Sequence, residues 1–327
     1  MSTSIWPPIA ADALKKEEDE SAARELSWLL DSLQETLASL KSGLEECYAL
    51  LAPIEPGSTL VMSSPRSESI KGHITRVGTR IVKGSLHLRL KTHPPTHPHL
   101  SPDCPLILPS LSQLRTLLNE SLDCVDITRW TGDRHSAPFI SSQLHLLHTI
   151  ILEALSLLKG PSLLEPIPIS PSNSPSPTPG VQKTAIPQTP HSAPDTSWFE
   201  SPPDPATFVP ALPSTLSLAL TLSDTSLVLT IRTLEPTSLQ PNLGSRFAFA
   251  IGAQRRLEHD EMDDVFMYRD EEVRVKEKIR VEGSADPSLL SLGAKLGALE
   301  RTVESARVGL GVVVGLGTGV EAEGSNN

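Results

Sequence analysis

The chain has 327 residues, of which 38% are hydrophobic and only 4% are aromatic, so its core must consist mostly of Leu, Ile and Val. This length is enough for one large domain or two modest ones. The formal net charge of −11 argues against a nucleic-acid-binding protein, because such proteins need an excess of Lys and Arg to displace counterions from phosphates.

The cysteines indicate a reducing compartment. Cys47, Cys104 and Cys124 are widely spaced and form no C-x-x-C pair. The segment Lys15 to Glu20 is charged, so we expect no signal peptide at the N-terminus. No uncharged apolar run reaches the roughly 18–20 residues of a membrane-spanning helix. These features together predict a soluble cytoplasmic protein.

Residues 1–20 are expected to be disordered, and a heptad pattern follows them. Apolar side chains are spaced 4-3-4-3-4-3-4 at Leu26, Leu30, Leu33, Leu37, Leu40, Leu44, Cys47 and Leu51. This spacing predicts a long helix that packs along its length on other helices, and Pro53 and Pro56 end it. Either a core-facing helix of a bundle or one strand of a dimeric coiled coil would show such a pattern. The recurrence of the pattern elsewhere in the chain favours the bundle.

The same spacing recurs three times. Two helices are predicted within residues 110–160, where Gly160-Pro161 ends the second. The last helix is predicted over 286–312 and begins with Asp286 as N-cap and Pro287 at its first position. Four amphipathic helices with matching apolar faces predict an antiparallel four-helix bundle.

The strand patterns fall in two blocks, 58–91 and 208–283. The clearest is a hairpin around a turn at Ser223–Ser226. Every second residue is apolar before the turn, at Leu216, Leu218, Leu220 and Leu222, and again after it, at Leu227, Leu229 and Ile231. Phe247, Phe249 and Ile251 alternate as well. We expect the two blocks to pair with each other in one antiparallel β lobe.

Two Pro-rich stretches, 92–109 and 161–207, are predicted linkers. The second is rich in Pro and Ser and is expected to be disordered, because such a composition buries too little apolar surface to offset chain ordering. The predicted fold is therefore α+β: an elongated two-lobe protein in which both lobes are built from discontinuous segments. The predicted boundaries are a disordered tail 1–20, a helical lobe 21–52, 110–160 and 286–312, a β lobe 58–91 and 208–283, the two linkers, and a flexible tail 313–327.

Several segments, taken together, resemble the Rogdi family. They are "ELSWLLDSLQETLASLKSGLEE" (25–46), "IKGHITRVGTRIVKGSLHLRL" (70–90), "FVPALPSTLSLALTLSDTSLVLTIRTLEP" (208–236) and, more loosely, "DVFMYRDEEVRVKEKIRVEG" (264–283). The fungal members of this family are the small subunit of the RAVE complex, the regulator of the ATPase of vacuoles and endosomes. The resemblance implies a leucine-zipper-like helical lobe and a β lobe, and it carries no catalytic residues over to this chain.

The resemblance also implies a function. A fungal member would be a non-enzymatic adaptor that binds the large RAVE scaffold subunit and V-ATPase catalytic-sector subunits, and would promote their reassembly onto the membrane sector. It would be cytoplasmic and recruited to vacuolar or endosomal membranes only through its partners. The alternative from another class is a coiled-coil structural or tethering protein that associates with itself through its heptads.

Three groups of residues contain side chains that occur in metal, nucleotide or catalytic sites. His93, His97, His99 and Cys104 have the ligand types of a zinc site, but the prolines between them favour a solvated loop. The glycines of "GLGVVVGLGTGV" (309–320) follow a predicted helix, which does not fit a dinucleotide loop. The acidic cluster at 258–264 lies between predicted strands and is interpreted as a solvated loop. We therefore predict no catalytic residues, no cofactor-binding residues, no metal ligands and no cofactor.

The 161–207 linker contains candidate phosphorylation sites. Ser170, Ser174, Ser176, Thr178, Thr189 and Ser201 each precede proline, the pattern of proline-directed kinase targets. Each phosphate would add about −1.5 to −2 of charge. A biased composition alone would produce the same pairs.

Overall fold

A computed structural model describes residues 10–160, 196–237, 259–262 and 264–314. The chain divides into two compact units, each assembled from separated segments. Unit 1 comprises residues 1–55, 109–157 and 287–327, and unit 2 comprises residues 56–108 and 158–286. Helices and antiparallel strands are both present, so the predicted α+β class is confirmed.

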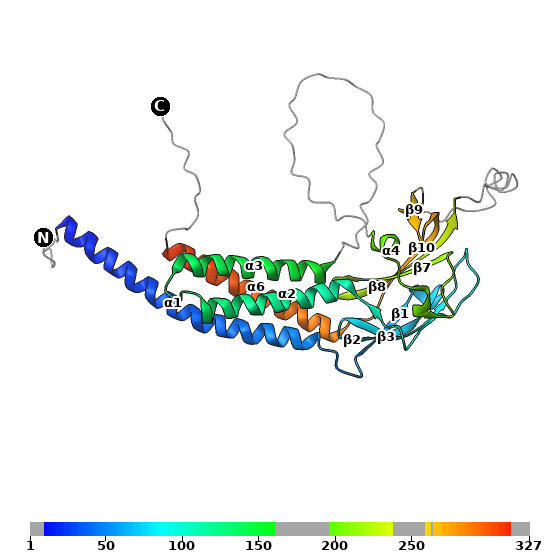
Figure 1. Cartoon of the computed structure of the whole chain (residues 1–327), viewed down its shortest axis with the longest axis horizontal. Helices are drawn as coiled ribbons and strands as arrows, with labels where there is room; N and C mark the ends of the chain where they lie inside the picture. The colour runs from blue at the N-terminus through cyan, green and yellow to red at the C-terminus, as the bar shows by residue number, and fades with distance from the viewer. Residues whose placement is uncertain (1–9, 161–195, 238–258, 263, 315–327) are drawn as a thin grey trace, which may run out of the picture. The chain divides into compact units, whose positions relative to one another are not determined.

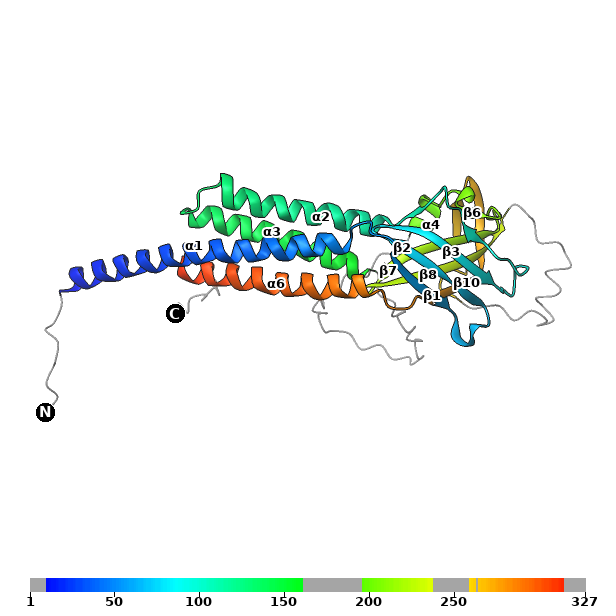
Figure 2. The ribbon, with the colours of Figure 1, turned by 90° about the horizontal axis from the view of Figure 1, so that it is seen from below.

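Unit 1 is helical. Its elements are α1 (Ala11–Leu50), α2 (Pro109–Asp126), the π-helix η2 (Ile127–Thr131), most of α3 (Ala137–Lys159) and α6 (Pro287–Val313). The helices run alongside one another in both views (Figures 1 and 2). The heptad side chains of α1 form its buried face, and Leu37, Leu40 and Leu44 are at most 1% exposed. The predicted long helix packed on other helices is therefore confirmed.

The first helix starts earlier than the sequence indicated. Residues 11–20 were expected to be disordered, but they form the first turns of α1 and are all exposed. Their Ala, Lys and Glu side chains are strong helix formers. Lys16 and Glu20 lie 3.8 Å apart as an i,i+4 ion pair, which adds local support. This segment is helical without contributing a buried face.

Among the described residues, α3 is long and apolar enough to cross a membrane by length and composition alone. Its apolar side chains Ile140, Leu144, Leu147 and Ile151 are at most 2% exposed, as in a core helix. Core helices of globular proteins pass the same test, so the helix carries no argument for a membrane span.

Unit 2 holds two antiparallel sheets. Sheet A contains β1 (Ser58–Ser63), β2 (Ile70–Val77), β3 (Arg80–Leu88), β4 (His99–Leu100) and β6 (Phe208–Val209) in that order, with β5 (Leu106–Ile107) paired to β3. Sheet B has the order β7 (Leu216–Ser223), β8 (Ser226–Pro236), β10 (Glu271–Glu282) and β9 (Val265–Tyr268). The short helices η1 (Pro65–Ser67), α4 (Ser197–Glu200) and η3 (Pro205–Thr207) connect them.

The predicted hairpin is confirmed. Strands β7 and β8 pair from Leu216–Thr233 to Ser223–Ser226. Asp224 and Thr225 take positive φ values of 45° and 63°, which suits a two-residue hairpin turn.

The prediction that the two strand blocks pair with each other in one sheet is wrong. They form two sheets whose apolar faces share a small cavity, lined by Ile74 and Leu86 of sheet A and by Leu218 and Leu229 of sheet B. The isolated Met62–Gly283 bridge joins the two blocks directly, and β6 of the second block pairs with β4, which lies in the predicted 92–109 linker. The free edge of β8 pairs instead with β10, from Val273–Pro236 to Glu282–Val228. Side-chain alternation identifies a strand but contains little information about which strand pairs with it. The sequence therefore predicted the strands and not their partners.

Both predicted linkers need correction where they are described. Residues 92–109 contain β4 and β5, which pair with β3. Residues 196–207 contain α4, whose Trp198 is 2% exposed. The rest of the second linker (161–195), the predicted 247–251 strand and residues 315–327 of the predicted tail lie outside the described residues.

Candidate interaction surfaces

The sequence-predicted metal candidates do not converge. His97 Nδ1 lies 2.8 Å from His87 Nδ1, and His93 Nδ1 lies 2.9 Å from the Pro94 carbonyl oxygen. Among the described residues, no three His, Cys, Asp or Glu side chains gather closely enough to hold a metal ion. His87, His93 and His97 therefore offer exposed hydrogen-bonding groups without a metal site.

Where it is described, the acidic cluster lies in a turn between strands, and Asp260 and Asp264 are exposed, as a solvated loop predicts, but Asp260 and Glu261 are also ion-pair partners of cations on the sheet. Glu261 accepts two hydrogen bonds from Arg232, from Nε at 2.7 Å and from Nη2 at 2.8 Å. Lys278 donates to Asp260 at 2.7 Å and lies 2.9 Å from Glu261. Glu258 and Asp263 lie outside the described residues. These contacts hold the 259–262 segment against β8 and β10.

Arg232 is the centre of this arrangement. Its side chain is 3% exposed, and its guanidinium carbon lies 4.4 Å from the ring centroid of Trp198. Burial alone would raise the pKa of Glu261, but the hydrogen bonds and charges of Arg232 and Lys278 outweigh burial and lower it. The buried guanidinium is thus paired with a carboxylate through Nε and Nη2 and packed on an aromatic face, while its Nη1 has no hydrogen-bond partner among the described residues.

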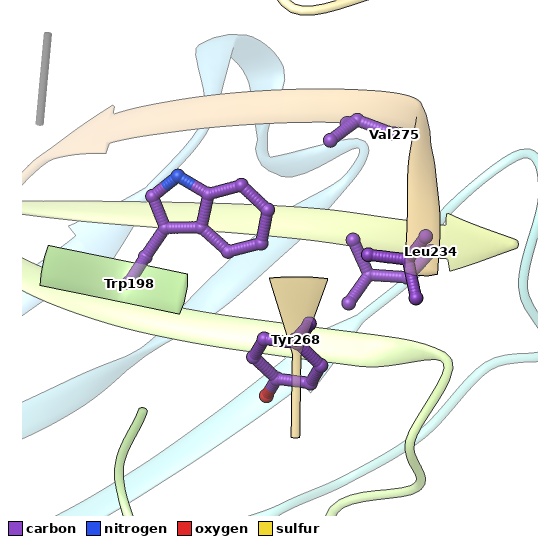
Figure 3. Close-up of a cluster of buried hydrophobic side chains, with 5 residues drawn as sticks. Trp198, Leu234, Tyr268 and Val275 are labelled. Atoms are coloured by element: carbon purple, nitrogen blue, oxygen red, sulfur yellow. The ribbon is translucent and has the colours of Figure 1, made fainter. Parts of the chain in front are cut away.

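Trp198 covers one face of sheet B. Figure 3 shows it beside Leu234, Tyr268 and Val275, which come from β8, β9 and β10. Its ring centroid lies 5.0 Å from that of Phe266 in a T-shaped arrangement. A four-residue helix has little stability of its own, so α4 is held in place by these contacts.

A β-bulge in β10 places its apolar side chains on both faces of sheet B. The register shifts between Val275 and Glu277, which places an extra residue in β10. Before the shift, Val275 packs in the Trp198 cluster; after it, Val281 pairs with Leu229, which faces sheet A. Val275 and Val281 are six residues apart and would share a face in a regular strand, but the bulge places them on opposite faces.

The outer face of sheet A, opposite the apolar cavity, is polar and rich in histidine. One row across the paired strands contains Lys71, His87 and His97, and the next contains His73, Ser85 and His99. We call this set of six residues the histidine face. The strands that carry it, β2 and β3, cross the strands of sheet B in the view of Figure 2.

In unit 1, α1 and α6 border a shallow groove. The groove is lined by small and polar side chains, Ser32, Thr36, Ala298, Thr302, Ser305 and Ala306, with Leu29, Leu33, Arg301 and Gly309 at its margins. Its lining offers no nucleophile beside a base. No feature of the groove selects one occupant.

Sequence reasoning missed two buried residues on the face of sheet B that α4 covers, Trp198 and Arg232. Trp198 stands in a Pro- and Ser-rich stretch, where "SWFE" is an isolated aromatic pair. Such a pair is the one available signal, since large aromatic side chains are rarely left in solvent. Arg232 interrupts an apolar strand, which indicates a buried charge with a partner.

Two comparisons with known proteins agree with this architecture. The family described as "Rogdi leucine zipper containing protein" matches residues 25–311, which include the helices of unit 1 and both sheets. A protein of Schizosaccharomyces pombe, "Regulator of V-ATPase in vacuolar membrane protein 2", is 26% identical over 289 residues. The similarity covers 86% of this chain and 90% of that protein.

Proposed function

Because the chain belongs to the Rogdi leucine zipper family, we propose that it is a non-enzymatic adaptor subunit of a RAVE-like complex that promotes V-ATPase assembly. Its partners would be the large scaffold subunit of that complex and subunits of the V-ATPase catalytic sector. It would act in the cytoplasm and reach vacuolar or endosomal membranes through these partners. It would bind neither nucleic acid nor a cofactor.

One observation carries this proposal. The similarity to the S. pombe regulator extends over 86% of this chain and 90% of that protein, so it spans both units. An adaptor of this kind raises the effective concentration of its partners by holding them together, without covalent chemistry. The described surfaces support this function, since they are built of ion pairs, packed aromatics and a polar sheet face.

We also propose that unit 1 is a self-contained antiparallel four-helix bundle. The buried heptad residues of α1 support this proposal. The contacts of α1 with α2 and α6 point the same way, as do the hydrogen bonds that join Gln113 to Glu153 and His148 to Glu300. The competing function, a coiled-coil tether that associates with itself, would need the same residues at an interface between two chains. Sedimentation equilibrium of the purified protein distinguishes the two, and a stable dimer would favour the tether.

The decisive experiment is a pull-down of the tagged protein from native lysate, followed by mass spectrometry. We expect a very large scaffold protein and catalytic-sector subunits of the V-ATPase to be recovered. A second arm expresses the chain in S. pombe cells lacking the related regulator and measures vacuolar pH, and the expected result is restored acidification. Recovery of this protein alone, with no restored acidification, would contradict the proposal.

A further inference from the structure

Charge in this chain is strongly segregated. The chain as a whole has a formal charge of −11, yet residues 58–100 contain six exposed Lys and Arg, besides the buried and ion-paired Arg76, against one carboxylate, Glu68. The same stretch holds five of the ten histidines. None of the strands of sheet A contains Asp or Glu. A basic surface in an acidic protein points to an acidic ligand.

The sheet gathers these groups on one face. Side chains alternate along a strand, so Ile74 and Leu86 point into the apolar cavity while Lys71, His73 and His87 lie on the opposite face. Lys83 lies on that same face, two residues before Ser85. The charged and titratable groups around His87 are Lys71 from β2, Arg89 just beyond β3, and His97 from the segment before β4.

The contacts of His87 define its protonation state. Arg89 donates Nε–H to His87 Nε2 at 3.0 Å, and a guanidinium only donates, so His87 Nε2 is the acceptor. The proton of His87 is therefore on Nδ1 and is donated to His97 Nδ1 at 2.8 Å. The chain of hydrogen bonds from Arg89 through His87 to His97 requires both imidazoles to be neutral. Desolvation, followed by the charges of His97, Arg89 and Lys71, lowers the pKa of His87.

We propose that the histidine face is a docking surface for an acidic segment of a partner protein, and that it binds more tightly as pH falls. Three fixed cations are present at neutral pH: Lys71 on the histidine face, and Lys83 and Arg89, which lie beside it on the same side of the sheet. Imidazoles gain protons between about pH 8 and pH 5, which adds charge to the same face. A bound carboxylate favours the protonated form because it accepts charge-assisted hydrogen bonds from imidazolium. The proposal rests on the proposed function in one respect, since an adaptor needs such a surface.

An acidic protein segment fits this face better than the other anionic macromolecules. Recognition of anionic membranes typically uses clusters of about 4–8 Lys or Arg, and this face has three fixed cations. Proteins that bind single-stranded nucleic acids typically stack bases on large aromatic side chains, and the residues on this face include no Phe, Tyr or Trp. Ser85 and the imidazoles can hydrogen-bond to carboxylates, which suits Asp and Glu side chains.

The test uses the purified full chain and a fluorescein-labelled 16-residue peptide of alternating Glu and Ser. Its carboxyl groups stay ionised at pH 6.0, because glutamate has a pKa near 4.3. Fluorescence anisotropy at low salt should show a Kd at least about fivefold lower at pH 6.0 than at pH 7.5, as the imidazoles gain charge. The variant with His73→Gln, His87→Gln, His97→Gln and His99→Gln should keep binding at pH 7.5 and lose most of this pH dependence.

A matched pair of charge reversals tests the location. The Lys71→Glu, Arg89→Glu variant should weaken binding at least about tenfold at both pH values, because two cations on the face become anions. The Arg274→Glu, Arg280→Glu variant changes charge by the same amount on β10 and should bind like the unmodified protein. Circular dichroism melts of all variants check that they are folded.

Three results would overturn the proposal: equal weakening by both charge reversals, an unchanged pH dependence in the histidine variant, or binding to phosphatidylserine vesicles without binding to the peptide. The measurement uses pure components, so its failure would leave a positive pull-down of V-ATPase subunits standing. A failed pull-down with intact peptide binding would instead contradict the proposed function.

Discussion

Arg76 donates its Nε–H to Oδ2 of Asp286 at 2.6 Å, although the two residues are 210 positions apart in the sequence. Both side chains are almost fully buried, at 3% and 0% exposure. Ser58 donates to the other carboxylate oxygen at 3.2 Å, and Arg76 also donates to the Gly78 carbonyl. Asp286 was predicted from sequence as the N-cap of the last helix, which does begin at Pro287. Its carboxylate also fixes the segment after β10 to strands β1 and β2.

Replacing Asp286 with Ala should destabilise the protein by about 3–5 kcal/mol, because it leaves the Arg76 guanidinium buried without its counter-ion. Urea denaturation followed by circular dichroism measures this change. Glu20→Ala is the matched control, since it removes a carboxylate from the exposed pair with Lys16 and should cost less than about 1 kcal/mol. Equal stability of the two variants would contradict the assigned role of the buried pair.

Replacing Trp198 with Ala should cost about 3–5 kcal/mol, the usual range for removing a buried Trp side chain. Its loss removes the aromatic contacts on sheet B and the cation–π partner of Arg232. Trp28 is 69% exposed, so Trp28→Ala is a control of the same chemistry and should leave the unfolding midpoint nearly unchanged. Thermal melts of both variants give the comparison. If Trp198→Ala melted like Trp28→Ala, α4 would not be part of the packed fold.

The pairing of Glu261 with Arg232 and Lys278 predicts a loss of stability in acid. The folded-state pKa of Glu261 is lowered, so its contribution is present above the unfolded-state pKa and is lost as pH falls through the folded-state value. Glu261→Gln should remove that contribution and flatten the dependence of unfolding free energy on pH below about pH 5. Denaturant unfolding of both proteins between pH 3 and pH 7 checks this expectation. An unchanged acid dependence in the variant would show that other carboxylates dominate it.

Sequence patterns predicted the elements whose side chains repeat regularly. The 4-3 spacing of Leu33, Leu37 and Leu40 gave α1, and the alternation from Leu216 to Ile231 gave the β7–β8 hairpin. The 3-4 spacing of the last predicted helix, 286–312, likewise gave α6, which spans Pro287–Val313. In each case the local pattern determines both the element and its buried face.

The remaining features depend on contacts between distant segments. Val275 and Val281 have the same parity, and no Gly or Pro marks the bulge that sends them to opposite faces of sheet B. Trp198 belongs to a stretch whose composition indicates disorder, and its partners come from β8, β9 and β10. The six residues of the histidine face come together only once β2, β3 and β4 are in register. Composition and periodicity contain none of this information.

The cysteines should differ sharply in reactivity. Burial raises the pKa of Cys47 to about 11, and burial also raises the pKa of Cys124. The thiolate is the reactive form, so both should resist labelling at pH 8 in the folded protein, whereas Cys104 is partly exposed. Titration with Ellman's reagent should find one reactive thiol in native protein and three in urea. Cys104→Ser should abolish the native signal, and fast labelling of that variant would contradict the buried placement of the other two.

The approach of α1 to α6 at Gly43 gives the sharpest test of helix packing in unit 1. A Cβ atom on Gly43 would lie 2.6 Å from Leu299 Cδ2, whereas one on Gly309 would meet nothing within 4 Å. Gly43→Leu should therefore force the helices apart and cost about 1–3 kcal/mol, as overpacking usually does. Gly309→Leu should stabilise α6 by a few tenths of a kcal/mol, because leucine has the higher helix propensity. Urea unfolding of the two variants measures the difference, and equal effects would show that α1 and α6 are not in close contact at Gly43.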